Sequence, residues 1–186
     1  MTVGPWKPIY LHAYTARVSD FHVKSTLSDA LDVAKLDISI ALSSIPVVFS
    51  PSGLQATVTI SKPDGCVLAA HKVPLTSSTS EGFNLNGKLE LELNKKEDIA
   101  LWWPVGYGAQ PLYTVNVDIH VSKEDGLPAS AVPLATKSQR FGLRRVKVVQ
   151  EPLEGQEGLS FLFEVNNVRI FVGGSNWSVF VLISYG

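Results

Sequence analysis

Apolar and polar residues alternate with a period of two through most of this chain. The longest run covers residues 113–121, where apolar residues at odd positions alternate with polar residues at even positions. Residues 36–42, 54–60 and 89–93 repeat the pattern, and no segment shows a convincing helical period. Strands of this kind bury one face and expose the other, as in antiparallel sheets. The alternation therefore predicts an all-β fold.

Turn-forming residues divide this pattern into seven predicted strands. Residues 51–53 (PSG), 63–65 (PDG) and 84–87 (NLNG) are strong turn signals. Seven short antiparallel strands favour an immunoglobulin-like sandwich of two sheets, and a barrel with the same strand count is the alternative. The alternation changes phase at Arg144 and Arg145, which predicts a bulge or a bend there. We expect strands near residues 16–24, 32–43, 54–61, 65–72, 87–93, 111–122 and 138–150.

Charge and cysteine content exclude several classes of function. The formal net charge is -1, so the chain has no basic footprint for nucleic acid or for an acidic membrane surface. The single cysteine, Cys66, cannot form an internal disulfide, and the apolar Val67 and Leu68 after it predict a buried, inert thiol. The four histidines show no metal-ligand spacing, so we expect no metal and no cofactor; they are His12, His22, His71 and His120.

Targeting signals are not evident in the sequence. Residues 1–6 lack a basic patch followed by an apolar run, so no secretory signal peptide is predicted. No apolar run approaches the roughly 20 residues that a membrane-spanning helix needs. Without such signals, a cytoplasmic location is the default prediction.

The most distinctive local motif is LWWPVGYGAQPLY at residues 101–113. It places Trp102, Trp103 and Tyr107 among prolines and glycines that fix the shape of a loop. The two tryptophans could form a platform on which a sugar ring stacks. The alternative is that they close the end of the sandwich and pack against a neighbouring domain. Because adjacent residues of an extended segment point to opposite faces, at most one tryptophan would face a ligand.

The motif at 101–113 closely resembles the sandwich domain of family 2 glycoside hydrolases, in particular their β-mannosidase branch. Three further segments agree with the family in the same order. Residues 4–11 (GPWKPIYL) resemble the last strands of its N-terminal jelly roll, and residues 141–144 (FGLR) resemble its final sandwich strand. Residues 161–177, with FLFEVNNV and GSNW, resemble the hairpin and first strand that lead into its catalytic (β/α)8 barrel.

The resemblance implies a division into three parts. Residues 1–15 would be a remnant of the sugar-binding jelly roll, and residues 16–150 the complete sandwich. Residues 151–186 would be a linker, whose acidic, glycine-rich part is 152–158, followed by the start of a truncated barrel. The implied partners are the barrel and jelly-roll domains of the parent enzyme, and its substrates would be β-mannosides or manno-oligosaccharides. Neither nucleic acid nor membrane is an expected partner.

The resemblance also implies that the chemistry lies outside this chain. The family hydrolyses glycosides with two glutamates on later barrel strands, and the parent enzyme would remove terminal β-D-mannose. We expect no catalytic residue here and an inactive fragment. Asn176 and Trp177 would lie at the barrel's sugar-binding mouth, and Trp102, Trp103 and Tyr107 would form a domain-docking loop.

The last residues depart from the family pattern. After Asn176-Trp177 the family continues with an Ile-Pro stretch and an acidic residue, whereas this chain reads SVFVLISYG. We interpret this as the mark of a truncated or misjoined gene model. Two other functions remain open from the residues alone. The chain could be a stand-alone carbohydrate-binding module, or a β-sandwich that binds another protein.

Overall fold

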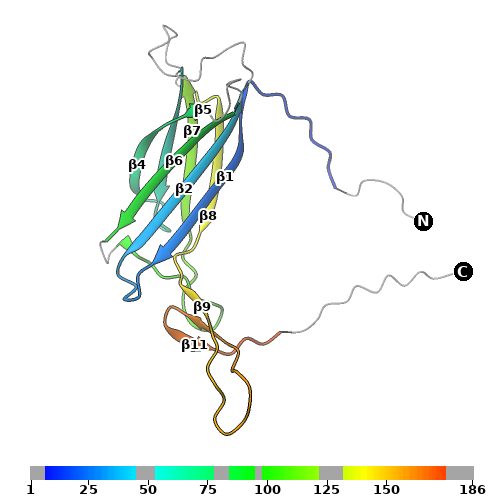
Figure 1. Ribbon diagram of the computed structural model, residues 1–186. Coiled ribbons are helices and arrows are strands. Elements are labelled where there is room, and N and C mark those ends of the chain that lie inside the picture. The colour runs from blue at the N-terminus through cyan, green and yellow to red at the C-terminus, as the bar shows by residue number, and fades with distance from the viewer. Residues whose placement is uncertain (1–6, 45–52, 78–83, 95–97, 122–131, 175–186) are drawn as a thin grey trace, which may run out of the picture.

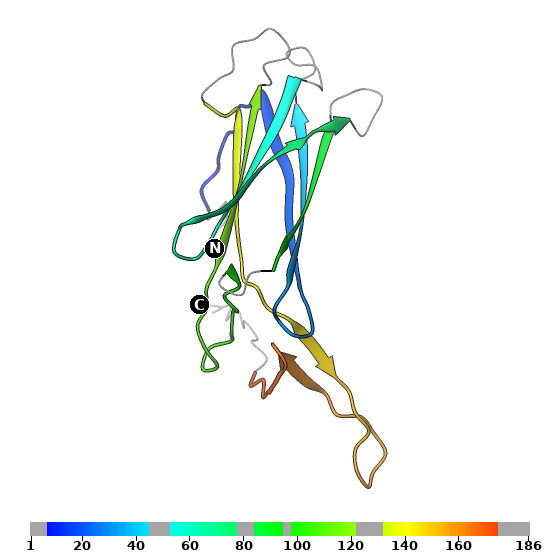
Figure 2. The same ribbon diagram turned by 90° about the vertical axis from the view of Figure 1, so that its left-hand side faces the viewer.

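The computed structural model describes residues 7–44, 53–77, 84–94, 98–121 and 132–174. These residues form β-strands, turns and loops, and they contain no α-helix. Within them, no helix is long and apolar enough to cross a membrane. Figures 1 and 2 show two sheets packed face to face, with a smaller sheet at one end. The predicted all-β sandwich is confirmed.

Each layer of the sandwich is an antiparallel sheet of four strands. The first has the order β1-β2-β6-β5 and the second the order β4-β3-β7-β8. The chain passes from one sheet to the other between β2 and β3, between β4 and β5, and between β6 and β7. These crossings give the immunoglobulin-like arrangement. The strands are β1 (Ala16–Leu27), β2 (Ala34–Ser44), β3 (Leu54–Ser61), β4 (Val67–Pro74), β5 (Thr76–Ser77), β6 (Asn84–Leu93), β7 (Tyr113–Val121) and β8 (Ala135–Phe141).

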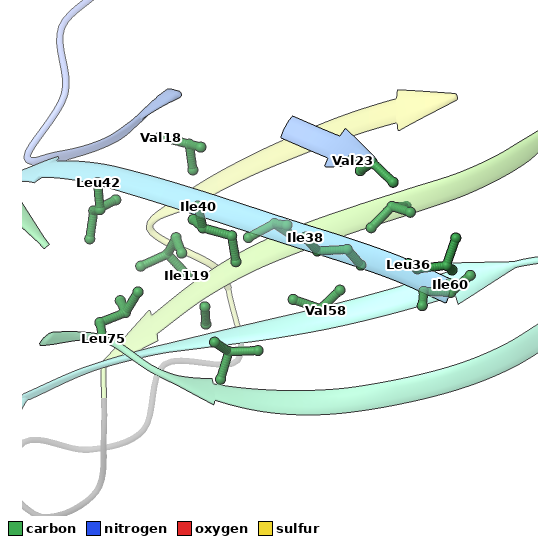
Figure 3. Packing of buried hydrophobic residues seen from close by; sticks show 14 of the residues in the cluster. Val18, Val23, Leu36, Ile38, Ile40, Leu42, Val58, Ile60, Leu75 and Ile119 are labelled. Atoms are coloured by element: carbon green, nitrogen blue, oxygen red, sulfur yellow. The ribbon is translucent and has the colours of Figure 1, made fainter. Parts of the chain in front are cut away.

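The core lies between the two sheets, where the apolar side chains of the alternating strands meet. In β3 and β7 every second residue is buried, which is the pattern that the sequence predicts. Figure 3 shows Ile38 and Ile40 of β2 facing Val58 and Ile119 of the opposite sheet. All four are at most 2% exposed. The burial of these apolar surfaces is the main stabilising term for the fold.

Tyr113 anchors the connection from β6 to β7. Its ring is 1% exposed and stacks on Phe141, with ring centroids 5.5 Å apart. Its hydroxyl donates a hydrogen bond of 2.5 Å to the carbonyl of Asp98 and accepts one of 2.7 Å from the amide of Ala100. A tyrosine at this corner that bonds back to the preceding loop is a hallmark of immunoglobulin-like sandwiches.

Burial raises the pKa of the Tyr113 phenol, and the negative charges of Asp98 and Asp64 act in the same direction. The hydrogen bond from the Ala100 amide and the charge of Lys62 oppose this rise. The phenol is therefore held in its neutral form, as its donation to the Asp98 carbonyl requires.

Two sequence-based predictions about strands are wrong. Residues 84–87 were expected to form a turn, but they begin β6 and pair with β2, with Asn84 opposite Ser43 and Gly87 opposite Ile40. Residues 138–150 were expected to form one strand with a bulge or bend. Instead, β8 ends at Phe141 and β9 (Val146–Val149) belongs to another sheet. The phase change at Arg144 and Arg145 therefore marks the point where the chain leaves the sandwich.

The prediction that Cys66 is buried is also wrong. Its side chain is exposed at the end of the turn that joins β3 to β4. The turn is the predicted one, since Gly65 has a φ of +89° and its amide donates to the carbonyl of Lys62 at 2.9 Å. The Cys66 amide donates to Asp64 Oδ1 at 2.9 Å, which keeps this residue in the turn rather than in the strand that follows.

A third sheet of three strands lies at one end of the sandwich (Figures 1 and 2). It has the order β11-β10-β9, with β10 at Leu162–Val165 and β11 at Val168–Ile170. The hairpin that the resemblance implies is present, and its turn is formed by Asn166 and Asn167, whose φ values of +50° and +65° suit a type I′ turn. Residues 152–158, predicted to be an inter-domain linker, form the loop that closes the hairpin between β9 and β10.

One face of this small sheet is apolar. Val146 and Val148 of β9 lie opposite Val165 and Phe163 of β10, which in turn face Val168 and Ile170 of β11. Val165 and Ile170 are buried, whereas Val146 and Val148 are each 52% exposed and Val168 is 43% exposed. We call these six residues the apolar face of the β9–β11 sheet.

Candidate functional site: the junction between sandwich and hairpin

The segment that carries the two tryptophans lies beside the segment that leaves the sandwich. Leu101 forms a parallel bridge with Leu143, and the Trp102 amide donates a hydrogen bond of 2.8 Å to the Leu143 carbonyl. The Leu143 side chain is completely buried and belongs to the core. This pairing fixes Trp102 at the end of the sandwich next to the crossing to β9.

The indole of Trp102 packs on main chain and on a cation. A β-carbon at Gly142 would come within 2.8 Å of Trp102 Cβ and Cγ, so only glycine allows this approach. The guanidinium carbon of Arg144 lies 4.5 Å from the centre of a Trp102 ring, which is a cation–π contact. These contacts hold the side chain of Trp102 against its own domain.

Trp103 and Tyr107 make their hydrogen bonds within their own loop. The Trp103 amide donates to the Ala109 carbonyl at 2.9 Å, and the Tyr107 amide donates to the Pro104 carbonyl at 3.0 Å. Trp103 packs on Gly108, where a β-carbon would approach its side chain to 2.8 Å. The two tryptophans thus contact different surroundings, as expected for neighbours on an extended segment.

Asn166 joins the hairpin to this end of the sandwich. Its side chain is 3% exposed. Its Oδ1 accepts a hydrogen bond of 2.9 Å from the Arg145 amide, and its Nδ2 donates one of 2.9 Å to the Trp102 carbonyl. Its own amide donates to the Arg145 carbonyl, also at 2.9 Å. One residue therefore connects three segments: the hairpin turn, the crossing from β8 to β9, and the tryptophan loop.

A second set of polar contacts surrounds Asn166. The Arg145 guanidinium pairs with Asp29, which lies in the loop between β1 and β2, and donates to Asn167 Oδ1 at 2.9 Å. The Asn167 Nδ2 donates to the Asp29 carbonyl at 2.7 Å. We call Asp29, Trp102, Gly142, Arg144, Arg145, Asn166 and Asn167 the junction.

A shallow hollow of about 480 Å³ lies beside the junction. Trp102, Arg140 and Arg144 line it together with Ser25 and apolar residues, and its lining contains no carboxylate. Glycoside hydrolysis by the usual retaining or inverting route needs two carboxyl groups that flank the scissile bond. The described hollow therefore offers binding and packing surfaces but no acid–base pair. Within the described residues, no cluster of histidine, cysteine and carboxylate side chains could hold a metal ion.

The predicted site residues are only partly brought together. Trp102 contacts the hairpin through its carbonyl, whereas the hydrogen bonds of Trp103 and Tyr107 stay within their loop. Asn176 and Trp177 lie outside the described residues. The sequence marks Asn166 only as part of the hairpin that the family resemblance implies. Its partners are 21 and 64 residues away in sequence, so no local pattern could reveal its role.

Comparison with known proteins decides the family. The sequence model of the family described as glycosyl hydrolases family 2 matches residues 16–144. The match runs from the start of β1 to Arg144, whose guanidinium lies over Trp102. The chain belongs to glycosyl hydrolase family 2. Among curated relatives, β-mannosidase B of Thermothelomyces thermophilus is 32% identical over 177 residues, and that of Neosartorya fischeri is 34% identical over 177 residues. In both cases the match covers 95% of this chain and 18% of the relative.

Solved structures of other proteins share the fold at low sequence identity. A β-glucuronidase from Bifidobacterium dentium superposes with a TM-score of 0.58 at 18% identity, covering 82% of this chain and 21% of that chain. An exo-chitosanase from Amycolatopsis orientalis superposes with a TM-score of 0.57 at 21% identity. That match covers 88% of this chain and 16% of the exo-chitosanase chain. At this identity the likeness supports the architecture alone.

Proposed function

We propose that this chain is the sandwich part of a β-mannosidase-type hydrolase, in which it positions the catalytic barrel and takes no part in the chemistry. The observation that carries the proposal is the extent of the match. Similarity to β-mannosidase B runs through 95% of this chain but through only 18% of the relatives. In this proposal the remaining length of the enzyme supplies the barrel, and with it the glutamate pair that hydrolyses terminal β-D-mannosides.

The division into domains is part of the same proposal. Residues 1–15 would belong to a jelly roll, residues 16–150 to the sandwich, and residues 151–186 to the start of the barrel. The family match to residues 16–144 supports the middle part. Asn176 and Trp177 would contact sugar only once a barrel surrounds them.

The geometry of the tryptophan loop supports a bracing role. Trp102 packs on Gly142 and Arg144, and Trp103 packs on Gly108. A sugar platform needs a free aromatic face, and the Arg144 guanidinium lies over a Trp102 ring, with its carbon 4.5 Å from the ring centre. The loop would therefore contribute to domain docking through Trp102, Trp103 and Tyr107.

A segment exchange tests the proposal directly. The matching 177 residues of β-mannosidase B from Thermothelomyces thermophilus would be replaced by those of this chain. We expect the chimaera to hydrolyse an aryl β-mannoside, and we expect this chain alone to show no turnover. The matched control carries the corresponding segment of the Amycolatopsis orientalis exo-chitosanase, which shares the fold but not the close sequence similarity. A folded but inactive chimaera, or turnover by the chain alone, would contradict the proposal.

The carbohydrate-binding alternative has its own measurement. Titration with mannose and manno-oligosaccharides should leave the tryptophan fluorescence of this chain unchanged if the loop is a brace. A saturable change that disappears in Trp103→Ala would support a binding module instead.

A further inference from the structure

Asn166 is the only buried polar or charged residue in the part of the chain that the structure describes. A buried amide is tolerated when its donor and acceptor are both satisfied. Both ends of the Asn166 side chain are bonded, Oδ1 to the Arg145 amide and Nδ2 to the Trp102 carbonyl, each at 2.9 Å. Its partners lie on two different segments, which the asparagine therefore holds together.

The hairpin turn itself does not require this side chain. A type I′ turn needs positive φ at its two central residues, and glycine meets this need. Asn167 adopts the same conformation with a φ of +65° and remains exposed. The burial and bonding of Asn166 thus exceed what the turn demands.

We propose that the side chain of Asn166 is a positioning element that fixes the direction in which the β9–β11 sheet leaves the sandwich. The amide can satisfy both segments in only one orientation, because the acceptor must face an N–H group and the donor must face a carbonyl. The contacts of Arg145 with Asp29 and Asn167 flank this point and close the other side of the junction. The proposal deepens the proposed function, in which the barrel follows this hairpin and inherits its direction.

Residual dipolar couplings of the whole chain test the proposal. In the wild-type chain, amides of the sandwich and of the β9–β11 sheet should fit one alignment tensor. In Asn166→Gly, which keeps the positive φ accessible, the two groups of amides should require different tensors. Hydrogen exchange at the Arg145 amide should be faster by about tenfold or more, because its acceptor is lost. Asn167→Gly removes from the same turn the exposed amide that bonds Arg145 and Asp29. We expect this variant to keep the single tensor, because both side-chain hydrogen bonds of Asn166 remain.

An Asn166→Asp variant separates positioning from general packing. The introduced carboxylate can accept from the Arg145 amide, but its second oxygen opposes the Trp102 carbonyl. Protonation would restore a donor there, so the single tensor should return as the pH falls. The charged groups around this point are Arg145, Arg144 and Asp29. Asp29 pairs with Arg145 beside this point, so Asp29→Asn serves as the control for any contribution of that pair.

Each outcome decides the proposal. The proposal is supported if the two groups of amides in Asn166→Gly require different alignment tensors while hydrogen exchange in the sandwich is unchanged. It is supported further if Asn166→Asp regains a single tensor in acid. A single wild-type tensor in Asn166→Gly overturns it, as does a loss of protection throughout the sandwich, which would make the residue a general determinant of folding. None of these measurements depends on activity. They can therefore fail while the β-mannosidase chimaera succeeds, or succeed while it fails.

Discussion

The side chain of Trp102 packs so closely against Gly142 that no β-carbon fits between them. A β-carbon added at that glycine would lie 2.8 Å from both Trp102 Cβ and Cγ, well inside ordinary contact distance. The sandwich is thus closed at this end by a ring packed on backbone. The contact also places the Trp102 carbonyl where the Asn166 amide reaches it.

Replacement of this glycine should displace the tryptophan. We expect Gly142→Ala to lower the free energy of unfolding by about 1–3 kcal/mol, because the ring or the backbone must shift to accommodate the methyl group. Urea denaturation followed by tryptophan fluorescence measures the change. Gly174→Ala is the matched control, since that position has open space around it and no positive φ. Equal stability of the two variants would contradict the packing argument.

Loss of the Tyr113 hydroxyl should destabilise the sandwich. Tyr113→Phe leaves the Ala100 amide and the Asp98 carbonyl without their partner, at a cost of about 1–3 kcal/mol. Tyr107→Phe removes a hydroxyl from a half-exposed ring and should change the free energy of unfolding little. If both substitutions have the same effect in urea denaturation, the corner is not a stabilising feature.

The same tyrosine predicts a dependence of stability on alkaline pH. The pKa of Tyr113 is raised in the folded chain, so the folded state keeps this proton to a higher pH than the unfolded state, whose phenol titrates near pH 10. Its contribution to stability is therefore fully present below about pH 10 and is lost as the pH rises through the folded pKa. Urea denaturation in this range should show a shallower decline for Tyr113→Phe than for Tyr107→Phe. Equal slopes would contradict the prediction.

The apolar face of the β9–β11 sheet should promote self-association. Val148 is 52% exposed on this face, and exposed apolar strand surfaces associate readily. We expect Val148→Lys to reduce association in sedimentation velocity over a range of concentrations. Val67→Lys replaces a valine that is 64% exposed on β4, away from that face, and should have no such effect. Unchanged association of Val148→Lys would show that another surface is responsible.

Cys66 should react in the native state. Its side chain is exposed, so a disulfide reagent should modify one thiol per chain without denaturant. Cys66→Ser should abolish the signal. A thiol that reacts only after unfolding would restore the sequence-based expectation of burial.

The alternation of residues predicts the two faces of each sandwich strand because it depends on neighbours in sequence. The turn signal at Asn84–Gly87 is misleading, because buried and exposed residues alternate there too and the segment pairs with β2. Gly87 lies in β6, where a β-carbon would come within 3.0 Å of Val73 Cγ1, so this glycine serves close packing rather than a turn. Pairing with β2 therefore outweighs the local preference of these residues.

The phase change at Arg144 and Arg145 is visible in the sequence, but its meaning is not. A bulge and a departure to another sheet produce the same shift in alternation. Only the pairing of β9 with β10 distinguishes them. The candidate site shows the same limit, since the motif reveals Trp102 while the residue that bonds its carbonyl lies 64 positions further along.

The three hydrogen bonds of Asn166 all end on main-chain atoms, of Trp102 and Arg145. Such atoms are present whatever side chain a position carries. The corner between sandwich and hairpin thus demands a particular residue at 166 while tolerating exchange of the side chain at 145. Substitutions of the charged side chains around this corner would change its surface chemistry but would leave the direction of the β9–β11 sheet unchanged.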